Sequence, residues 1–209
     1  MLIEPYIEAP AACLEYDPLA PEVARLISEL ILSESVALSD TSENARSGHS
    51  QFQTSPTMPE GVASELNRQA RPDLRVEHIG STSVPGCAGK GVIDLMLLYG
   101  EGGLEHAKRV LDWLGFQRQS TRDPFPESRP MRLGAINYQG KIYRTHVHVI
   151  PATSPEAAEL QGFRDHLRAD PELMKAYVDR KRAIVDAGIV DTVDYCEAKG
   201  EFIVGTTKR

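Results

Sequence analysis

The sequence predicts a single α/β domain, 1–209, in which helices cover a mixed, mostly antiparallel sheet of about five strands. An apolar run from Val92 to Leu98 has the length and branching of a buried strand. Two further strand-like runs, 131–138 and 141–150, flank Gln139-Gly140, which is typical of a two-residue hairpin turn. Segments with apolar residues at helical spacing precede and follow these runs, and we expect them to cover the sheet.

The N-terminal part is predicted to be an arm followed by a helix. Met1 to Ala12 contains two prolines that disfavour a helix, so an extended arm is expected. Asp17 then opens a helix with one apolar stripe that we expect to end near Leu38. The polar segment 39–59 has almost no branched aliphatic residues and is predicted to be a mobile surface insertion. A second helix is predicted from about 60 to 69.

The middle of the chain is predicted to hold a helix and a loop. Leu104–Leu114 has apolar residues at helical spacing, and we expect His106 on this helix to be exposed. The segment 120–130 contains three prolines and alternating charge, which is typical of a loop, and we expect it near the rim of a site. Three arginines in or beside it could contact an acidic substrate or be ordinary surface residues: Arg122, Arg129 and Arg132.

The C-terminal third is predicted to be helical, with a start at Ser154-Pro155 and a restart at Pro171. Three of its basic side chains could neutralise phosphates if they face the sheet, and would be ordinary surface residues if they face water: Arg164, Lys181 and Lys199. Arg164 with Asp165 is alternatively a structural ion pair.

The stretch from Gly80 to Asp94 carries the strongest chemical signal. Gly80 lets the backbone turn or approach a ligand closely. The hydroxyls and free amides of Ser81, Thr82 and Ser83 can wrap an anion. Asp94 stands in an otherwise apolar strand, so it must be paired, hydrogen-bonded or bound to a metal.

His146 and His148 are the predicted partners of Asp94, because alternating strand residues share one face. Two imidazoles facing a carboxylate suit a divalent metal or a phosphate-bearing substrate. Alternatively, they are hydrogen-bonded residues on a half-exposed sheet. Cys87, beside the turn, is either a nucleophile or, more commonly at such positions, a small buried filler.

Several motifs occur together in one order: GSTSVPG, GKGVIDL, HVHVI, GFRDHLRADPELMKAY and RKRAIV. In this order, from about Tyr16 to Ile203, the chain resembles the GrpB family of the nucleotidyltransferase superfamily. The resemblance implies a nucleotidyltransferase-like core with a phosphate-binding turn, matched by Gly80 and Ser81, and metal-binding carboxylates, of which Asp94 matches the first. Met96 stands where a second carboxylate is usual, and a thioether is a poor ligand for magnesium. The HVHVI strand lies where a third carboxylate is expected, so histidine replaces it.

The preferred hypothesis is a metal-assisted, nucleotidyltransferase-like enzyme that acts on a nucleotide or another phosphorylated or carboxylate-bearing small molecule. Asp94, His146 and His148 would bind a divalent metal (Mg, Mn or Zn) or move a proton. Lys90 and Lys181 would add positive charge next to the turn. Two alternatives are a degenerate site that binds a ligand without chemistry, because of Met96, and a metal-dependent hydrolase that uses the two histidines.

Composition excludes some classes of function. The net charge of −7 argues against a general nucleic-acid binder. The sequence has no run of about 18 apolar residues and no basic-then-apolar N-terminus, so neither a membrane span nor a signal peptide is expected. Cys13, Cys87 and Cys196 are far apart, which favours reduced thiols in a cytoplasmic protein. The sequence identifies no protein partner.

Overall fold

The computed structural model describes residues 2–47 and 73–207. Its centre is one five-stranded sheet in the order β1-β2-β5-β4-β3. The strands are β1 (Leu74–Ile79), β2 (Val92–Tyr99), β3 (Gln117–Arg118), β4 (Met131–Tyr138) and β5 (Lys141–Pro151). Only the β2–β5 pair is parallel, and the other neighbouring pairs are antiparallel. The predicted mixed, mostly antiparallel sheet is therefore confirmed.

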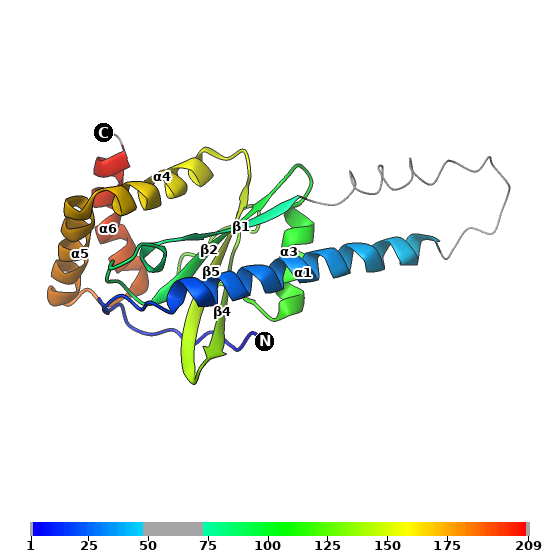
Figure 1. The fold of residues 1–209 in the computed structure, drawn as a ribbon, viewed down its shortest axis with the longest axis horizontal. Helices are drawn as coiled ribbons and strands as arrows, with labels where there is room; N and C mark the ends of the chain where they lie inside the picture. Colours follow the sequence, from blue (N-terminus) through cyan, green and yellow to red (C-terminus); the bar gives the residue numbers. More distant parts are fainter. Residues whose placement is uncertain (1, 48–72, 208–209) are drawn as a thin grey trace.

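Two groups of helices cover the sheet (Figure 1). The helices are α1 (Ala20–Ser47), the 3₁₀ turn η1 (Ser81–Ser83), α3 (Leu104–Leu114), α4 (Pro155–Ala169), α5 (Pro171–Asp186) and α6 (Thr192–Thr207). Helices α1 and α3 lie against each other, and α4, α5 and α6 gather at one end of the molecule. None of the described helices has the length and apolar character that crossing a membrane requires.

Alternation along β2 and β5 gives the sheet two different faces. Ile93, Leu95 and Leu97 of β2, together with Val147 and Val149 of β5, are fully buried in the apolar core beneath α1 and α3. The intervening residues point to the opposite face, toward α4. Alternation therefore sends Asp94, His146 and His148 away from the main core.

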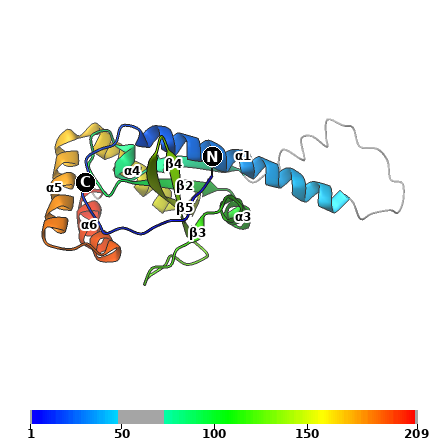
Figure 2. The ribbon, with the colours of Figure 1, turned by 90° about the horizontal axis from the view of Figure 1, so that it is seen from below.

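The N-terminal arm lies along the molecule and makes backbone contacts at both ends. Glu4 pairs with Ala135 of β4, and the Ala11 N–H donates to the Val190 carbonyl between α5 and α6. In Figure 2 the arm runs from the α5–α6 end across the sheet. The predicted absence of helix in this segment is confirmed for residues 2–12.

The predicted end of the first helix near Leu38 is wrong, because α1 continues to Ser47. A formed helix extends by one hydrogen bond per added residue, and 39–47 contains no glycine or proline to stop it. The lack of branched aliphatic residues therefore did not mark the end of the helix. The remainder of the predicted insertion 39–59 and the predicted helix at 60–69 fall in 48–72, outside the described residues.

The predicted exposure of His106 is also wrong. Its side chain is 5% exposed, and Nε2 lies 2.8 Å from Oγ of Ser35 on α1. The helix Leu104–Leu114 itself is confirmed, as is the hairpin, in which Gln139 and Gly140 both have positive φ. Packing of α3 against α1, which involves residues far apart in the sequence, buries the histidine.

Candidate functional site

Register between β2 and β5 places the predicted carboxylate beside the two histidines. Asp94 is level with His146 and Met96 with His148 in the parallel pair. Oδ1 of Asp94 lies 3.3 Å from Nδ1 of His146 and 3.9 Å from Nε2 of His148. Burial alone would raise the pKa of Asp94, but the two imidazoles outweigh it and hold that pKa below its usual range. Asp94 is therefore an ionised carboxylate flanked by two imidazoles.

His146 is fixed by contacts at both ring nitrogens. Burial lowers its pKa despite the neighbouring Asp94, so the ring is neutral near pH 7. A carboxylate can only accept, so Nδ1 carries the proton toward Asp94, and Nε2 accepts from the Tyr6 hydroxyl at 3.0 Å. Burial also raises the pKa of Tyr6, which keeps this hydroxyl protonated. His146 has no nitrogen left to exchange a proton with a ligand.

His148 is held more loosely. Nη1 of Arg129 lies 3.5 Å from Nδ1 of His148, and the Phe125 ring packs edge-on against the imidazole with centroids 5.9 Å apart. Arg129 is itself ion-paired with Glu156 of α4. Because the contacts of both its nitrogens are long, His148 is the better placed of the two histidines to transfer a proton.

The predicted anion-binding turn packs directly on Asp94. Gly80 has φ +70°, and a Cβ at this position would lie 2.4 Å from Oδ2 of Asp94, so only glycine fits. Gly80 and Ser81 line the cavity described below. The side chains of Thr82 and Ser83 do not: they are buried, and their hydroxyls donate to the carbonyls of Val92 and Gly80. The predicted phosphate contacts of these two hydroxyls are therefore not available in this structure, since both already have acceptors.

A cavity of about 450 Å³ opens over Asp94, between the sheet and helices α5 and α6. Its walls bring together the three predicted lysines: Lys90, Lys181 and Lys199. Nζ of Lys90 and Nζ of Lys199 lie 5.4 and 5.6 Å from the ring centroid of Tyr195. Neither ammonium group has a carboxylate within ion-pair distance among the residues that the structure describes. The cavity therefore offers positive charge to an incoming anion.

Lys181 is more fully engaged than the other two lysines. It is 2% exposed, its Nζ donates to the Ala88 carbonyl, and it lies 3.4 Å from Sγ of Cys87 and 4.2 Å from the Tyr177 centroid. Burial lowers the pKa of Lys181, and burial likewise lowers the pKa of Lys90. Cys87 is 2% exposed with a pKa raised by burial, which agrees with a buried filler and not with an activated nucleophile.

Four predicted arginine contacts lie elsewhere. Arg164 does not line the cavity and instead pairs with Glu77 and Asp165. Arg132 is 1% exposed and paired with two carboxylates, Asp112 and Glu127, so its suggested role as a substrate contact is wrong. Arg122 pairs with Asp194 at the surface, and Arg129, which is paired with Glu156, contacts the site only through His148 and the Phe125 ring among the described residues.

Two tyrosines of the site were missed in the sequence. Tyr195 is 1% exposed and lines the cavity, and its hydroxyl has no hydrogen-bond partner among the described residues. Its spacing of four residues from Lys199 on α6 was a usable signal, since such residues share a helical face. Tyr6 carried no local signal, because only the path of the arm brings it to His146.

The donor set does not fit the two-magnesium site that the superfamily resemblance implies. Met96 is fully buried in an apolar cluster with Ile79, Leu98 and Ile150, so no second carboxylate or open position exists there. Nδ1 of His146 already donates to Asp94. Among the described residues, no group of three or more His, Cys, Asp and Glu side chains is arranged to hold a metal ion. The metal site at Asp94, His146 and His148 stays a prediction.

Comparisons with known proteins agree with the motifs. The family model described as "GrpB protein" matches residues 53–209. A UPF0157 protein of Streptomyces coelicolor is 34% identical over 66% of this chain and 69% of its own length. A UPF0157 protein of Pseudomonas aeruginosa is 31% identical over 71% of this chain and 62% of its own length, so that match spans less than two thirds of the relative.

The crystal structure of the conserved protein GrpB from Enterococcus faecalis shares the fold. It superposes with a TM-score of 0.55 at 21% identity, covering 94% of this chain and 98% of that one. Together with the family match over more than half of the sequence, this leads to one conclusion. The chain belongs to the GrpB family.

Proposed function

We propose that the cavity binds a small molecule that carries a phosphate or carboxylate group, and that His148 transfers a proton at its reactive end. The supporting observation is that Lys90 and Lys199, with no carboxylate partner among the described residues, face the same cavity as Asp94 and His148. A nucleotide is the favoured substrate class because the motifs resemble the nucleotidyltransferase superfamily. A pocket of this volume is within the range of small-molecule sites.

In this proposal the anion is held by Lys90, Lys199 and the Ser81 hydroxyl at one side of the cavity. Nδ1 of His148 accepts the proton of a hydroxyl or amine that attacks the bound phosphoryl group, and the bond between phosphorus and its leaving oxygen breaks, so that the leaving group departs as an anion. The Asp94 carboxylate, which faces Nε2, stabilises the imidazolium that forms. His146 keeps Asp94 oriented and exchanges no proton itself. No step depends on a metal ion.

The second candidate is a protein that binds the same anion without chemistry. The buried Met96 favours it, because the usual second carboxylate of the superfamily is missing. Both candidates predict anion binding, but only the first predicts turnover. The two can therefore be separated with the same protein samples.

The test combines binding and turnover. Inorganic phosphate, AMP and ATP are titrated by calorimetry, and mixtures of nucleotides with small alcohols and amines are followed by mass spectrometry. In the enzyme hypothesis, replacing His148→Gln lowers turnover by about 100-fold or more and leaves binding within about threefold. Asp94→Asn also abolishes turnover, while anion binding is retained or tightened because a nearby negative charge is lost. Asp179→Asn, an exposed carboxylate on α5, is the control.

Binding without any product in the unmodified protein would select the second candidate. Failure of all three anions to bind would contradict both candidates. Turnover that survives His148→Gln unchanged would refute the role of His148.

A further inference from the structure

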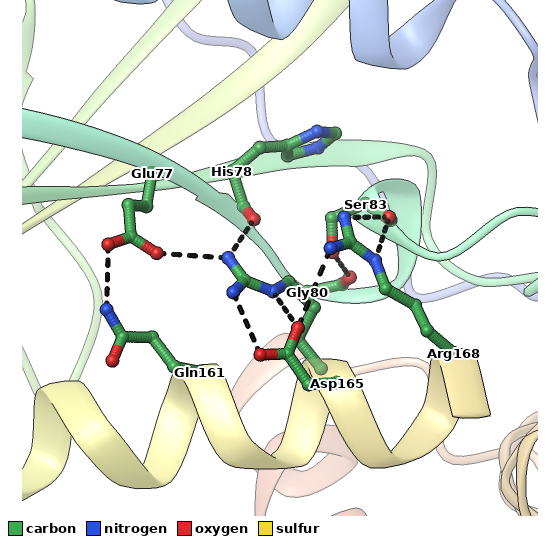
Figure 3. Close-up of polar contacts among 8 residues, drawn as sticks. Glu77, His78, Gly80, Ser83, Gln161, Asp165 and Arg168 are labelled. Atoms are coloured by element: carbon green, nitrogen blue, oxygen red, sulfur yellow. Dashed lines mark hydrogen bonds and ion pairs between the residues drawn. The ribbon is translucent and has the colours of Figure 1, made fainter. Parts of the chain in front are cut away.

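Two arginines of α4 contact the backbone at both ends of the anion-binding turn, Gly80–Ser83. Nη1 of Arg164 donates to the His78 carbonyl at 3.2 Å, before the turn. Nε and Nη2 of Arg168 donate to the Ser83 carbonyl at 3.1 and 2.7 Å, at its end (Figure 3). The two arginines lie four residues apart and so share one helical face. One face of α4 therefore donates hydrogen bonds to backbone carbonyls just before the turn and at its end.

Carboxylates and an amide hold these arginines in place. Glu77 accepts from Arg164 at 3.1 Å and from Gln161, one turn earlier on α4, at 2.7 Å. Asp165 pairs with Arg164 at 2.8 Å and also lies 3.6 Å from Arg168. In Figure 3, Gln161, Asp165 and Arg168 project from α4 toward β1 and the turn. The Arg164 side chain is 14% exposed, and four of its five N–H donors already go to Glu77, Asp165 and the His78 carbonyl.

The position of the turn determines where Ser81 lies relative to Asp94 in the cavity. The Ser83 N–H and hydroxyl both donate to the Gly80 carbonyl, so the two ends of the turn move together. Gly80 packs on Oδ2 of Asp94, and Oγ of Ser81 packs closely on Gly89, where a Cβ would be 2.3 Å away. A displacement at Ser83 would therefore shift Ser81 relative to Asp94.

We propose that Arg164 and Arg168 are positioning residues that hold the Gly80–Ser83 turn, and through it Ser81, in the geometry that binds an anion. This proposal rests on the proposed function only in naming the anion as what the turn binds. It differs from a simple helix-docking role in one respect. Loss of Arg168 must loosen the turn locally, and not only weaken the attachment of α4.

The test uses the full chain with Arg168→Met, and Arg182→Met as the matched control. Arg182 is a half-exposed arginine of α5 that pairs with the Glu15 side chain rather than with a carbonyl of the turn. Hydrogen–deuterium exchange is measured without ligand at the amides of Ser83 and Val84, which are hydrogen-bonded within the turn. Inorganic phosphate binding is measured by calorimetry, and overall stability by urea unfolding.

For Arg168→Met, exchange at the two amides is expected to rise by about tenfold or more while amides of β2 and β5 stay protected. Phosphate affinity is expected to fall by about tenfold, because Ser81 is displaced. Arg168→Lys is expected to restore part of both effects, since an ammonium group can donate to the same carbonyl. Arg182→Met is expected to change neither.

Unchanged exchange in the turn would overturn the proposal, whatever happens to phosphate binding. A uniform rise across the whole sheet would also overturn it, because that pattern indicates general destabilisation. Faster exchange in the turn of a protein that binds no phosphate would support the positioning role and contradict the proposed function. The two ideas can therefore fail separately.

Discussion

Basic side chains of the C-terminal helices and of the segment before β2 fall into two groups with opposite surroundings. Arg164 and Arg168 on α4 are paired with carboxylates and backbone carbonyls. Lys199 on α6, with Lys90 after the turn, faces an aromatic ring and has no carboxylate partner among the described residues. A paired charge stabilises the fold in which it is paired, whereas an unpaired one at a cavity is costly unless a ligand neutralises it. This difference underlies the proposed roles, in which the two arginines stabilise the fold and the two lysines bind the anion.

The largest effect is expected from removing the two lysines that have no carboxylate partner among the described residues. Lys90→Met with Lys199→Met should lower affinity for inorganic phosphate by about 100-fold or more, since each charge-assisted hydrogen bond contributes about 1.5–3 kcal/mol. The free energy of unfolding should stay the same or rise, because two neighbouring like charges are removed. Calorimetry and urea unfolding measure the two quantities. Lys175→Met, at an exposed pair on α5, is the control. A double variant that is clearly less stable would mean that the lysines are structural after all.

Removing a paired arginine should instead lower the free energy of unfolding. Arg164→Met should lower the free energy of unfolding by about 1–3 kcal/mol, because Glu77 is left partly buried without its cation. Combining it with Glu77→Gln should recover part of the loss. Arg25→Met, at an exposed pair on α1, should cost less than about 0.5 kcal/mol. Equal losses for the two arginines would remove the distinction between the partly buried and the exposed pair.

The partly buried His78, next to the turn, should make the stability of the protein depend on pH. Burial lowers the pKa of His78 to about 4, and its Nε2 donates to the Thr82 hydroxyl of the turn at 3.0 Å. The unfolded chain takes up this proton near pH 6.5, so the folded state loses stability as the pH falls from about 6.5 to about 4. Urea unfolding at a series of pH values should show a loss of roughly 2–3 kcal/mol by pH 4 that His78→Gln reduces. The same pH slope in both proteins would show that other groups cause it.

The smallest effect is expected at the arm. Tyr6→Phe removes the donor to Nε2 of His146 and should cost about 1 kcal/mol of stability. The ¹⁵N chemical shift of Nε2 should move, because this nitrogen loses its hydrogen bond. Nuclear magnetic resonance of the imidazole nitrogens measures this directly. An unchanged spectrum would mean that Tyr6 does not fix His146, and His146 would again be a candidate for proton transfer.

Much of the fold followed from local patterns. Alternation in β2 and β5 predicted which side chains leave the apolar core, and the two strands then brought Asp94 beside His146 and His148. The hairpin and the starts of α4 and α5 depend on turn and cap residues adjacent in sequence, so they too were predicted. The glycine turn was predicted for the same reason, since Gly80 is the residue that its backbone requires.

The sequence alone determined that basic residues lie at helical spacing on the C-terminal helices, but not which of them face the cavity. Arg164 and Lys199 gave the same local signal. Tertiary structure separated them, because Arg164 meets Glu77, 87 residues away, while Lys199 lines the cavity over the Tyr195 ring and has no carboxylate partner in the part of the chain that the structure describes. Tyr6 likewise reaches His146 across 140 residues. Pairing and burial of a charge depend on partners that only the folded chain brings together, so local spacing could not decide them.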